Sequence, residues 1–508
     1  MVYLYFMSVL CAMTNAGNVL LLTPFGSPSH KNLFTPTAYG LAEKGHSVTL
    51  VSIYKPKESS PNVKEVVMEN LIPTSKELVY WLCKEGIDGP TVEVLNGYIS
   101  TAKKMCETFF MNDLVQSWVK RKEKFDIVIV DGVLHDCLFP VANLMGKKVG
   151  ALNTAALFSW IADSIDSPYP YSIIPFYLFP FKARMNFWER MINAFSFSKY
   201  DHEMQSAYYP AMEEIVRKYY PQAITISESM KNLSLVLCNG EPLLGTIRPS
   251  VPTVKYMGGI HCRPGQAVEK VFEDFIQSGK DGFIIFSLGS IFNESLMSEE
   301  RKEHIFTAFS KLKYKIIWKI NADMGTGVPS NVKIVKWIPQ QNLLSHPKCI
   351  AFITHSGLLS LQEAVYHSVP MIVIPLFADQ PMNAALVEEL GIAVRLDWTN
   401  FTSDDLVKAV KTVTSLEVQS NLKKYSAIFK DVPSTSLEEA VFWTEYVMRN
   451  EIADSILRVN THGMNLIQYF SIDVIAFILI VAFTILIILY KCMRFNYFIV
   501  KNHKRKDE

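Results

Sequence analysis

Three short apolar runs, each followed by a helical pattern, constrain the fold of this chain more than any other feature. They lie at residues 332–335, 350–354 and 371–375. A strand, a helix and a second strand in succession form a βαβ unit, which places the two strands parallel in one sheet. The carboxyl ends of such strands lie along one edge, so the residues that follow the runs are expected to share one crevice.

The segments that follow the three runs carry polar and aromatic side chains. They read Trp-Ile-Pro-Gln at 337–340, His-Ser-Gly at 355–357 and Ala-Asp-Gln at 378–380. Together they offer the crevice an aromatic ring, amide groups, an imidazole at a helix N-terminus and a carboxylate. This set of groups suits a nucleotide-sugar.

An earlier α/β series begins near the N-terminus. Strands at 18–24 and 46–52, with a helical pattern at 32–44 between them, predict a βαβ unit. The segment at 25–31, which contains His30, is expected to be a loop after the first strand. A parallel sheet is therefore expected here as well.

This first sheet is expected to continue beyond the opening unit. A strand at 125–131 ends on Asp131, and further strands are expected at 149–153 and 235–239. The Gly-containing, charged stretch at 258–282 is the expected domain boundary. At 508 residues the chain is too long for one ordinary core, so two domains are the natural expectation.

The second series includes two strands ahead of the three runs. They are expected at 283–288, followed by the turn Gly289-Ser290, and at 315–319.

The segment at 158–197 is rich in aromatic residues and prolines and does not have the pattern of regular α/β structure. It is expected to line an apolar pocket, to rest on a membrane surface or to pack over the sheet.

Both ends of the chain carry apolar segments. Residues 1–16 resemble a cleavable secretory signal, the alternative being a first strand with a ragged start. Residues 474–490 contain no charge, and 472–490 are expected to span a membrane, the alternative being a buried soluble helix. The excess of Lys and Arg at 491–508 predicts a cytosolic tail and a luminal body, a single-pass type I topology.

The chain ends Lys-Arg-Lys-Asp-Glu, which resembles the dibasic retrieval signal of endoplasmic reticulum membrane proteins. The alternative is an ordinary basic flank of a membrane helix. Three glycosylation sequons, at Asn232, Asn293 and Asn400, fall on the predicted luminal side.

The eight cysteines include no CxxC pair, which argues against a disulfide scaffold and a zinc site. A net charge of +1 gives no indication of a nucleic-acid partner.

An anion site is predicted where the run at 350–354 leads directly into a helix. Free N–H groups at a helix start favour a phosphate, and Gly357 allows its close approach to the backbone. His355 and Ser360 add donors, and Gly289 with Ser290 forms a possible second cradle. Taken alone, His355 is just as readily a structural histidine.

The remaining candidates suit the nucleoside and the sugar. Glu363 is positioned to accept hydrogen bonds from both ribose hydroxyls, although a solvated helix face is the alternative. Trp337 is suited to stack on a pyrimidine and Gln340 to bind its edge, although a Trp is more often core. Asp379 and Gln380, expected at the end of the third run, are suited to sugar hydroxyls.

The joint pattern WIPQ…HP…FITHSG…QEA…VP…PLFADQ resembles the signature of the membrane-bound UDP-glycosyltransferases, most of all their invertebrate branch. The resemblance implies a GT-B fold, an α/β architecture with two Rossmann-like domains facing a cleft and one C-terminal transmembrane helix. It also implies the nucleotide-sugar site just described, comprising Gly289, Ser290, Trp337, Gln340, His355, Gly357, Ser360, Glu363, Asp379 and Gln380.

The chain departs from the signature at three positions. Leu359 stands where vertebrate and plant relatives usually carry Asn, and Leu-Leu-Ser there is normal for the invertebrate branch. Ser356 and Ser368 replace glycines. A Cβ at Ser356 is expected to crowd the phosphate or tilt the helix start, which makes donor affinity the property most in question.

Sugar transfer to an alcohol needs a base, because an alcohol is a poor nucleophile at neutral pH. An imidazole suits that role. The resemblance implies that His30 is this base and that Asp131 is its partner carboxylate, which holds the tautomer as in a catalytic triad. The sequence has no Asp-x-Asp metal motif, so helix N-termini and His355 are expected to stabilise the leaving UDP without a metal.

The resulting expectation is an inverting, metal-independent UDP-glycosyltransferase of the endoplasmic reticulum membrane with a role in detoxification. UDP-glucose is its expected co-substrate, a small lipophilic hydroxyl compound its acceptor, and no cofactor is expected. Association with itself or with a relative is left open. The alternative is a weak or inactive luminal relative that binds a lipophile or a partner.

The expected segments are a signal (1–16), an acceptor domain (17–260), a UDP-sugar domain (261–450), a juxtamembrane segment (451–471), a transmembrane helix (472–490) and a basic tail (491–508).

Overall fold

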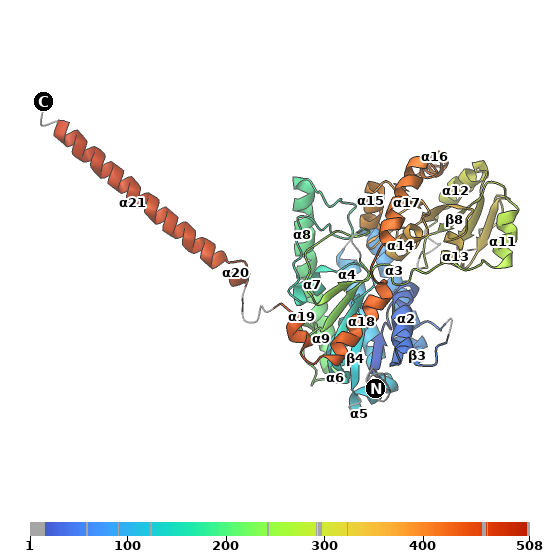
Figure 1. Cartoon of the computed structure of the whole chain (residues 1–508), viewed down its shortest axis with the longest axis horizontal. Helices are drawn as coiled ribbons and strands as arrows, with labels where there is room; N and C mark the ends of the chain where they lie inside the picture. The colour runs from blue at the N-terminus through green and yellow to red at the C-terminus, as the bar shows by residue number, and fades with distance from the viewer. Residues whose placement is uncertain are drawn as a thin grey trace, which may run out of the picture. The chain divides into compact units, whose positions relative to one another are not determined.

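The computed structural model describes residues 16–504, apart from residues 57–58, 90, 122–123, 241–242, 291, 293–296, 323, 460–463 and 465. The chain forms two compact units, which divide between Arg458 and Val459. The first unit contains two parallel sheets and their helices, and the second contains a long helix (Figure 1). Most of the expected signal segment, and the sequon at Asn293, lie outside the described residues.

The first sheet has the strand order β3-β2-β1-β4-β5-β6-β7, and all its strands are parallel. The order reverses between β1 and β4, which makes this pair the switch point of the sheet. The strands are β1 (Asn18–Leu22), β2 (Ser47–Ser52), β3 (Val63–Val67), β4 (Phe125–Asp131), β5 (Gly146–Asn153), β6 (Leu235–Cys238) and β7 (Val254–Tyr256).

Helices connect most of these strands, whereas no helix is described between β2 and β3 or between β6 and β7. Those before the second sheet are α2 (Pro28–Glu43), η2 (Glu69–Leu71), α3 (Ile72–Asp88), α4 (Val92–Phe110), α5 (Asp113–Arg121), α6 (Leu138–Met145), α7 (Ser159–Ser164), α8 (Phe187–Glu203), η3 (Met204–Tyr208), α9 (Tyr209–Tyr219), α10 (Ile226–Lys231) and α11 (Lys270–Gln277).

The second sheet repeats the pattern with the order β10-β9-β8-β11-β12-β13, again parallel throughout. Its switch point lies between β8 and β11. Its strands are β8 (Phe283–Ser287), β9 (Lys315–Lys319), β10 (Val332–Val335), β11 (Cys349–Thr354), β12 (Met371–Val373) and β13 (Ala393–Arg395). The helices that follow β8 are α12 (Glu299–Lys311), α13 (Gln340–Leu344), α14 (Leu358–Tyr366), α15 (Gln380–Glu389), α16 (Ser403–Val413), α17 (Leu416–Lys430), α18 (Ser436–Arg449) and α19 (Ala453–Leu457).

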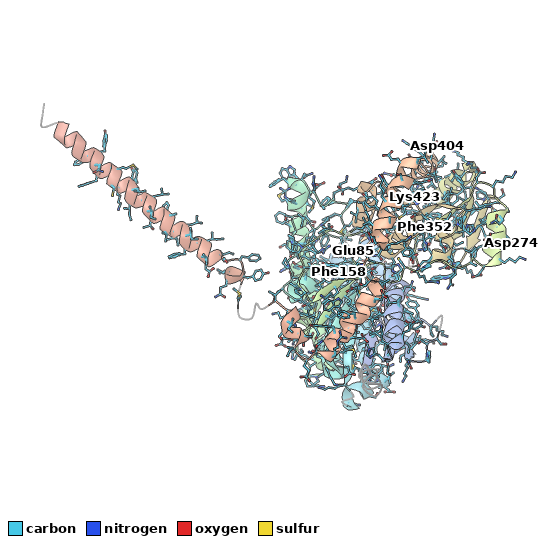
Figure 2. All side chains as sticks on the ribbon, viewed as in Figure 1. Glu85, Phe158, Asp274, Phe352, Asp404 and Lys423 are labelled. Carbon is cyan, nitrogen blue, oxygen red and sulfur yellow. A yellow bond between two sulfur atoms is a disulfide. The ribbon has the colours of Figure 1, made fainter. Side chains whose placement is uncertain are left out.

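The central strands of both sheets are buried on both faces, because side chains alternate along each strand and packed residues cover both faces. Leu20 and Leu22 of β1 pack in one core, whereas Val19 and Leu21 pack in another on the opposite face. The second sheet does the same: Phe352, labelled in Figure 2, lies on the face opposite Ile353. Nearly continuous apolar strands are typical of parallel sheets covered by helices.

The chain returns to the first sheet after completing the second. Helix α18 packs beside α2 and near β4 and β6, although almost two hundred residues separate it from β6 (Figure 1). Val441 and Val447 of α18 share a core with Val19 of β1. The segment at 261–450, expected to form the second domain, thus contributes a helix to the first, and the boundary at 260 remains a proposal.

The second unit contains α20 (Leu466–Tyr469) and α21 (Ile472–Lys504). Ile472–Phe498 of α21 contains an 18-residue window with a mean hydropathy of 3.1 and is long and apolar enough to cross a membrane. The helix begins at the predicted residue 472 and continues past the predicted end at 490.

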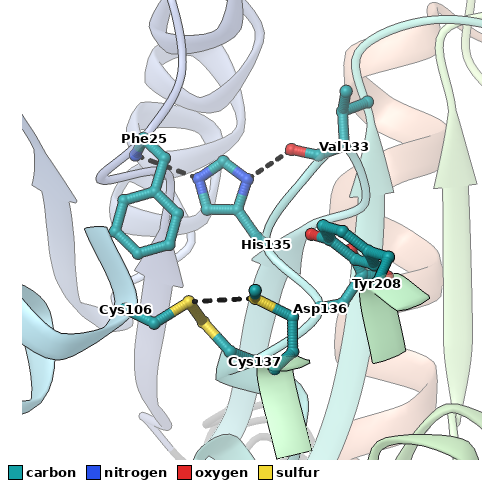
Figure 3. The surroundings of a disulfide bond; sticks show 8 residues. Phe25, Cys106, Val133, His135, Asp136, Cys137 and Tyr208 are labelled. Carbon is teal, nitrogen blue, oxygen red and sulfur yellow. Dashed lines mark hydrogen bonds between the residues drawn. A yellow bond between two sulfur atoms is a disulfide. The ribbon is translucent and has the colours of Figure 1, made fainter. Parts of the chain in front are cut away.

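One disulfide joins α4 to the start of α6. Cys106 and Cys137 are bonded, and the sequence left their pairing open (Figure 3). Met212 of α9 places its Sδ 3.8 Å from the Cys106 sulfur, so the bond lies in the apolar core. Cys137 lies six residues after Asp131, and the bond therefore secures the loop that follows β4.

We expect loss of this disulfide to destabilise the first domain. The bond closes a sequence separation of 31 residues, for which the loop-closure relation gives about 3–4 kcal/mol of free energy of unfolding. Dithiothreitol should lower the melting temperature of the wild-type protein but not that of a Cys106→Ala/Cys137→Ala variant. Cys262→Ala, at a free cysteine, is the control and should keep the dithiothreitol effect. A wild-type melting temperature insensitive to dithiothreitol would contradict the expectation.

Candidate active site

A cavity of about 370 Å³ lies where the loops at the carboxyl ends of both sheets meet. Every predicted site residue except Asp131 lines it. These residues are His30, Gly289, Ser290, Trp337, Gln340, His355, Gly357, Ser360, Glu363, Asp379 and Gln380. The loops after β1 and β8, one strand of each switch point, therefore contribute to the same space.

His30 and Asp131 form a hydrogen-bonded pair at the first switch point. The His30 Nδ1 lies 2.6 Å from the Asp131 Oδ2. The carboxylate is the acceptor, so Nδ1 carries the proton and Nε2 is left as the basic nitrogen. His30 lines the cavity, whereas Asp131 is fully buried behind it. This arrangement is that of a general base with an orienting carboxylate.

Asp131 is held by several donors. Its Oδ2 also accepts from the Thr23 hydroxyl at 2.9 Å, and its Oδ1 accepts from the Val133 N–H at 3.1 Å. Burial opposes ionisation, but the charges of His30 and His135 and the hydrogen bonds from His30 and Val133 outweigh it and lower the pKa of the Asp131 carboxyl. The carboxylate is consequently ionised at neutral pH.

His30 lies in a helix and not in a loop as the sequence predicted. Helix α2 begins at Pro28, a residue favoured in the first helical turn, so His30 belongs to that turn. A Cβ on Gly26 would lie 2.5 Å from the His30 Cβ. The glycine is needed because the chain passes so close to the histidine.

His135 is a site residue that the sequence reasoning missed. Its Nδ1 donates to the Val133 carbonyl at 2.6 Å, and its Nε2 accepts from the Phe25 N–H at 3.0 Å (Figure 3). Burial lowers the pKa of the ring to about 4, so it is neutral at physiological pH. The ring also stacks on Phe25 and so fixes the loop that leads to His30. A histidine four residues after a strand-ending aspartate was the available signal.

At the second switch point, His355 lies against two glycines. A Cβ on Gly289 would lie 2.7 Å from the His355 Nε2, and a Cβ on Gly357 would lie 2.5 Å from it. These glycines therefore make room for the imidazole as well as for a ligand. Burial, followed by the charge of Lys319, lowers the pKa of His355 to about 4. The ring is thus a neutral hydrogen-bonding group.

Lys319 adds a cation that the sequence reasoning missed. It is the last residue of β9, it lines the cavity, and its Nζ lies 2.5 Å from the Gly289 carbonyl oxygen. A charged residue at the carboxyl end of an apolar predicted strand was the available signal. An ammonium group beside the N-terminus of α14 suits an anionic ligand such as a diphosphate.

Gln340, Ser360 and Glu363 form a connected network. The Gln340 Nε2 donates to the Ser360 hydroxyl at 3.1 Å and to the Glu363 Oε2 at 2.6 Å. His261, not identified from the sequence, places its Nε2 3.6 Å from the Glu363 Oε1. Glu363 is therefore not on a solvated helix face. Trp337 is 52% exposed, so it is not a core residue.

Asp379 and Gln380 follow β12 after a loop and do not end the strand. Asp379 is the N-cap of α15, and its Oδ2 accepts from the Asn383 Nδ2 at 2.8 Å. Burial raises the pKa of Asp379 against the effect of this hydrogen bond. The Gln380 Oε1 accepts from the backbone N–H groups of Leu376 and Phe377 and so shapes the loop itself.

Ser356 was expected to crowd the ligand, but its side chain does not line the cavity. Its φ of +62° is a left-handed value that favours glycine, and its side chain is fully buried. The hydroxyl donates to the Gln380 carbonyl at 2.9 Å. Ser356 is absent from the cavity lining, while His355 and Gly357 on either side belong to it. The serine therefore packs between α14 and α15, away from the ligand space.

The first domain supplies an apolar and aromatic half of the cavity. Side chains of α3, α4 and the segment around α7 line it, including Phe158, which stacks on Trp160 (Figure 2). A second cavity of about 430 Å³ shares both of these residues. Part of the aromatic segment at 158–197 thus lines a pocket, as one of its interpretations predicted, whereas Trp188 is exposed.

Within the described part of the chain, no three His, Cys, Asp or Glu side chains are grouped to hold a metal.

Comparison with known proteins agrees with this architecture. The profile of the family described as "UDP-glucoronosyl and UDP-glucosyl transferase" matches residues 43–507. This chain belongs to that family. It is 32% identical to human UDP-glucuronosyltransferase 2B10 over 90% of this chain and 89% of that protein, and 31% identical to human UDP-glucuronosyltransferase 2B7 over 92% of each. The protein is therefore a UDP-glycosyltransferase, an enzyme that transfers sugar from a UDP-sugar.

Solved structures place the UDP-glycosyltransferase in the GT-B fold. The glycotransferase of kitacinnamycin matches with a TM-score of 0.58 at 19% identity, covering 85% of this chain and 99% of that one. Spinosyn forosaminyltransferase SpnP matches with a TM-score of 0.53 at 15% identity, with the same coverage. The predicted fold, two Rossmann-like sheets and a C-terminal apolar helix, is confirmed.

We expect Ser368→Gly to stabilise this UDP-glycosyltransferase. Ser368 follows α14 with a φ of +57°, a position where glycine avoids a left-handed penalty of about 1 kcal/mol. The melting temperature should rise. The matched reverse change is Gly45→Ala at a φ of +91°, where a Cβ meets nothing within 4 Å, and it should lower the melting temperature. A lower melting temperature for Ser368→Gly would contradict the strain argument.

Proposed function

We propose that this UDP-glycosyltransferase transfers a hexose, preferentially glucose, to a hydroxyl of a small lipophilic acceptor with inversion and without a metal. The observation that carries the proposal is the shared cavity. His30, with Asp131 buried behind it, lines the cavity from the first sheet, and His355 and Lys319 line it from the second. A base and an anion site then share one small volume, as a single displacement requires.

The chemistry follows from the two halves of the cavity. The His30 Nε2 takes the acceptor proton while the hydroxyl oxygen attacks the anomeric carbon. The bond from that carbon to the UDP oxygen breaks, and UDP leaves with the electron pair. Asp131 stabilises the imidazolium that forms, as an orienting carboxylate does. Lys319 and the start of α14 stabilise the charge on UDP. One displacement inverts the centre, so an α-linked donor gives a β-glycoside.

Glucose is favoured over glucuronate by the charges of the lining. Basic side chains among the described lining residues are His30, Lys319 and His355, and Lys319 lies beside the anion site. Asp379, at the proposed sugar end, would repel a uronate carboxylate. UDP-glucuronate is the second candidate donor because the named relatives are UDP-glucuronosyltransferases.

We further propose an endoplasmic reticulum membrane location with the catalytic body in the lumen and a role in detoxification. The apolar helix provides a single membrane anchor, and the basic residues that follow it favour the cytosol. The Cys106–Cys137 disulfide suits an oxidising compartment. Asn232 and Asn400 of two sequons are exposed, as glycosylation in the lumen requires.

We expect His30→Ala to reduce turnover by about 10²–10⁴-fold, the usual contribution of a general base. Binding of UDP should change little, because His30 lies on the acceptor side. Turnover is measured in permeabilised microsomes with UDP-glucose or UDP-glucuronate against a panel of phenols, alcohols and sterols, with and without EDTA. His202→Ala, at an exposed helical histidine, is the control. Full turnover by His30→Ala would overturn the base assignment, and transfer from UDP-glucuronate alone would overturn the donor assignment.

We expect Trp337→Ala to raise the Michaelis constant for the UDP-sugar. Base–aromatic stacking contributes roughly 1–3 kcal/mol, which corresponds to about a five- to hundredfold change. The maximal rate at saturating donor should change far less. Trp188→Ala removes a tryptophan of similar exposure outside both cavities and serves as the control. An unchanged Michaelis constant for Trp337→Ala would show that the ring does not contact the donor.

A further inference from the structure

A buried carboxyl group in the acceptor half of the cavity has no role in the transfer chemistry. Glu85 lies near the end of α3, it is 8% exposed, and it lines the cavity together with Phe158 (Figure 2). The residues of α3 that line the cavity with it include Leu78 and Leu82, so the carboxyl lies in apolar surroundings. A carboxyl group in such a place requires a partner.

The partner that Glu85 has is a neutral phenol. The Tyr98 hydroxyl of α4 donates to the Glu85 Oε2 at 3.0 Å. Burial raises the pKa of Glu85 to about 7 against the effect of this hydrogen bond, and the charge of Glu203 raises it further. Burial also raises the pKa of Tyr98, which therefore remains a donor. The carboxyl group is thus only partly compensated within the protein.

The surroundings of Glu85 are acidic and aromatic. Glu203, at the end of α8, lines the same cavity, as do Tyr177 and Tyr200. Glu203 is approached by the Lys199 Nζ at 3.8 Å, but the Lys199 side chain is 60% exposed and is not among the lining residues. The basic groups that do line the described cavity are His30, Lys319 and His355, which serve the two switch points. Among the described residues that line the acceptor half of this cavity there is therefore no cation, although Lys182, Arg184 and Arg248 line the adjoining cavity of about 430 Å³.

The position of Glu85 relative to the donor loop is fixed by direct packing. A Cβ on the adjacent Gly86 would lie 2.5 Å from the Leu376 carbonyl oxygen and 2.6 Å from the Phe377 Cβ. The end of α3 therefore rests on the loop that leads to Asp379. A group bound to Glu85 is held at a set place relative to the sugar, as an acceptor-recognition residue requires.

We propose that Glu85, supported by Tyr98, binds a protonated amine of the acceptor. The substrate class is then a lipophilic compound with a hydroxyl group at one end and a basic amine at the other, an inference that rests on the proposed function. An ammonium group supplies the cation that the acceptor half lacks, forms a charge-assisted hydrogen bond with the carboxylate and faces the rings of Tyr177 and Tyr200.

The test compares matched acceptors. One is a phenol with a dimethylamino group at the end of a short para-alkyl chain, and the other carries CH in place of the nitrogen. The wild-type enzyme should prefer the amine by kcat/KM. Glu85→Gln, which keeps the size of the side chain, should reduce that preference by about tenfold or more, because hydrogen bonds to charged groups are the stronger ones. Glu214→Gln removes a carboxylate with a 70% exposed side chain outside the cavity and should leave the preference as it is.

A second measurement separates this proposal from the proposed function. The same pair without the phenolic hydroxyl cannot accept sugar, and its binding is measured by displacement of a fluorescent lipophile from the full chain in detergent. The amine should bind more tightly than the carbon analogue, and Glu85→Gln should reduce the difference. Equal binding of the pair to the wild-type protein, or an equal difference in both proteins, would overturn the role of Glu85. Absence of transfer to every acceptor would instead overturn the proposed function.

Discussion

The contact between His30 and Asp131 is the constraint on which the site depends. A fully buried carboxylate is tolerated only where donors surround it, and Thr23, Val133 and His30 supply them. All of these residues lie at the carboxyl ends of β1 and β4 or just beyond them. The imidazole is therefore oriented by the topology of the first sheet. The Cys106–Cys137 disulfide and the hydrogen bonds of His135 then hold the loop that completes the arrangement.

Most strands could be predicted from the sequence because they are short, apolar and buried on both faces. The expected strands at 125–131 and 315–319 coincide with β4 and β9, and the one at 332–335 coincides with β10, which is only partly buried. Strand β3 was missed because it is only partly buried and its sequence includes two charged residues. The return of α18 to the first sheet was also missed. An amphipathic sequence predicts that a helix buries one face, but it does not predict which of two similar sheets that face contacts.

The residues proposed to bind the nucleotide-sugar were easier to assign to one cavity from the sequence than the rest of its lining. Gly289, His355 and Gly357 are required by a backbone that turns tightly around one imidazole, and such turns demand particular residue types at fixed spacing. Lys319 and His135 acquire their roles only through burial and contacts between distant segments. For Ser356, the sequence showed that a serine replaces a glycine, but not where its side chain would point. The side chain points away from the ligand space because the Gln380 carbonyl of α15 accepts its hydrogen bond.

In the proposed function, the two halves of the cavity recognise their ligands by different means. The donor half relies on backbone turns, which constrain the sequence strongly, whereas the acceptor half relies on side chains along α3 and α4, where many residues are compatible with a helix. We therefore expect a change at Glu85 to alter the proposed acceptor preference more than the fold. Gly86 limits this freedom, because any side chain at that position would separate α3 from the loop before Asp379. The proposed acceptor helix is thus constrained at Gly86 by its contact with the loop before Asp379.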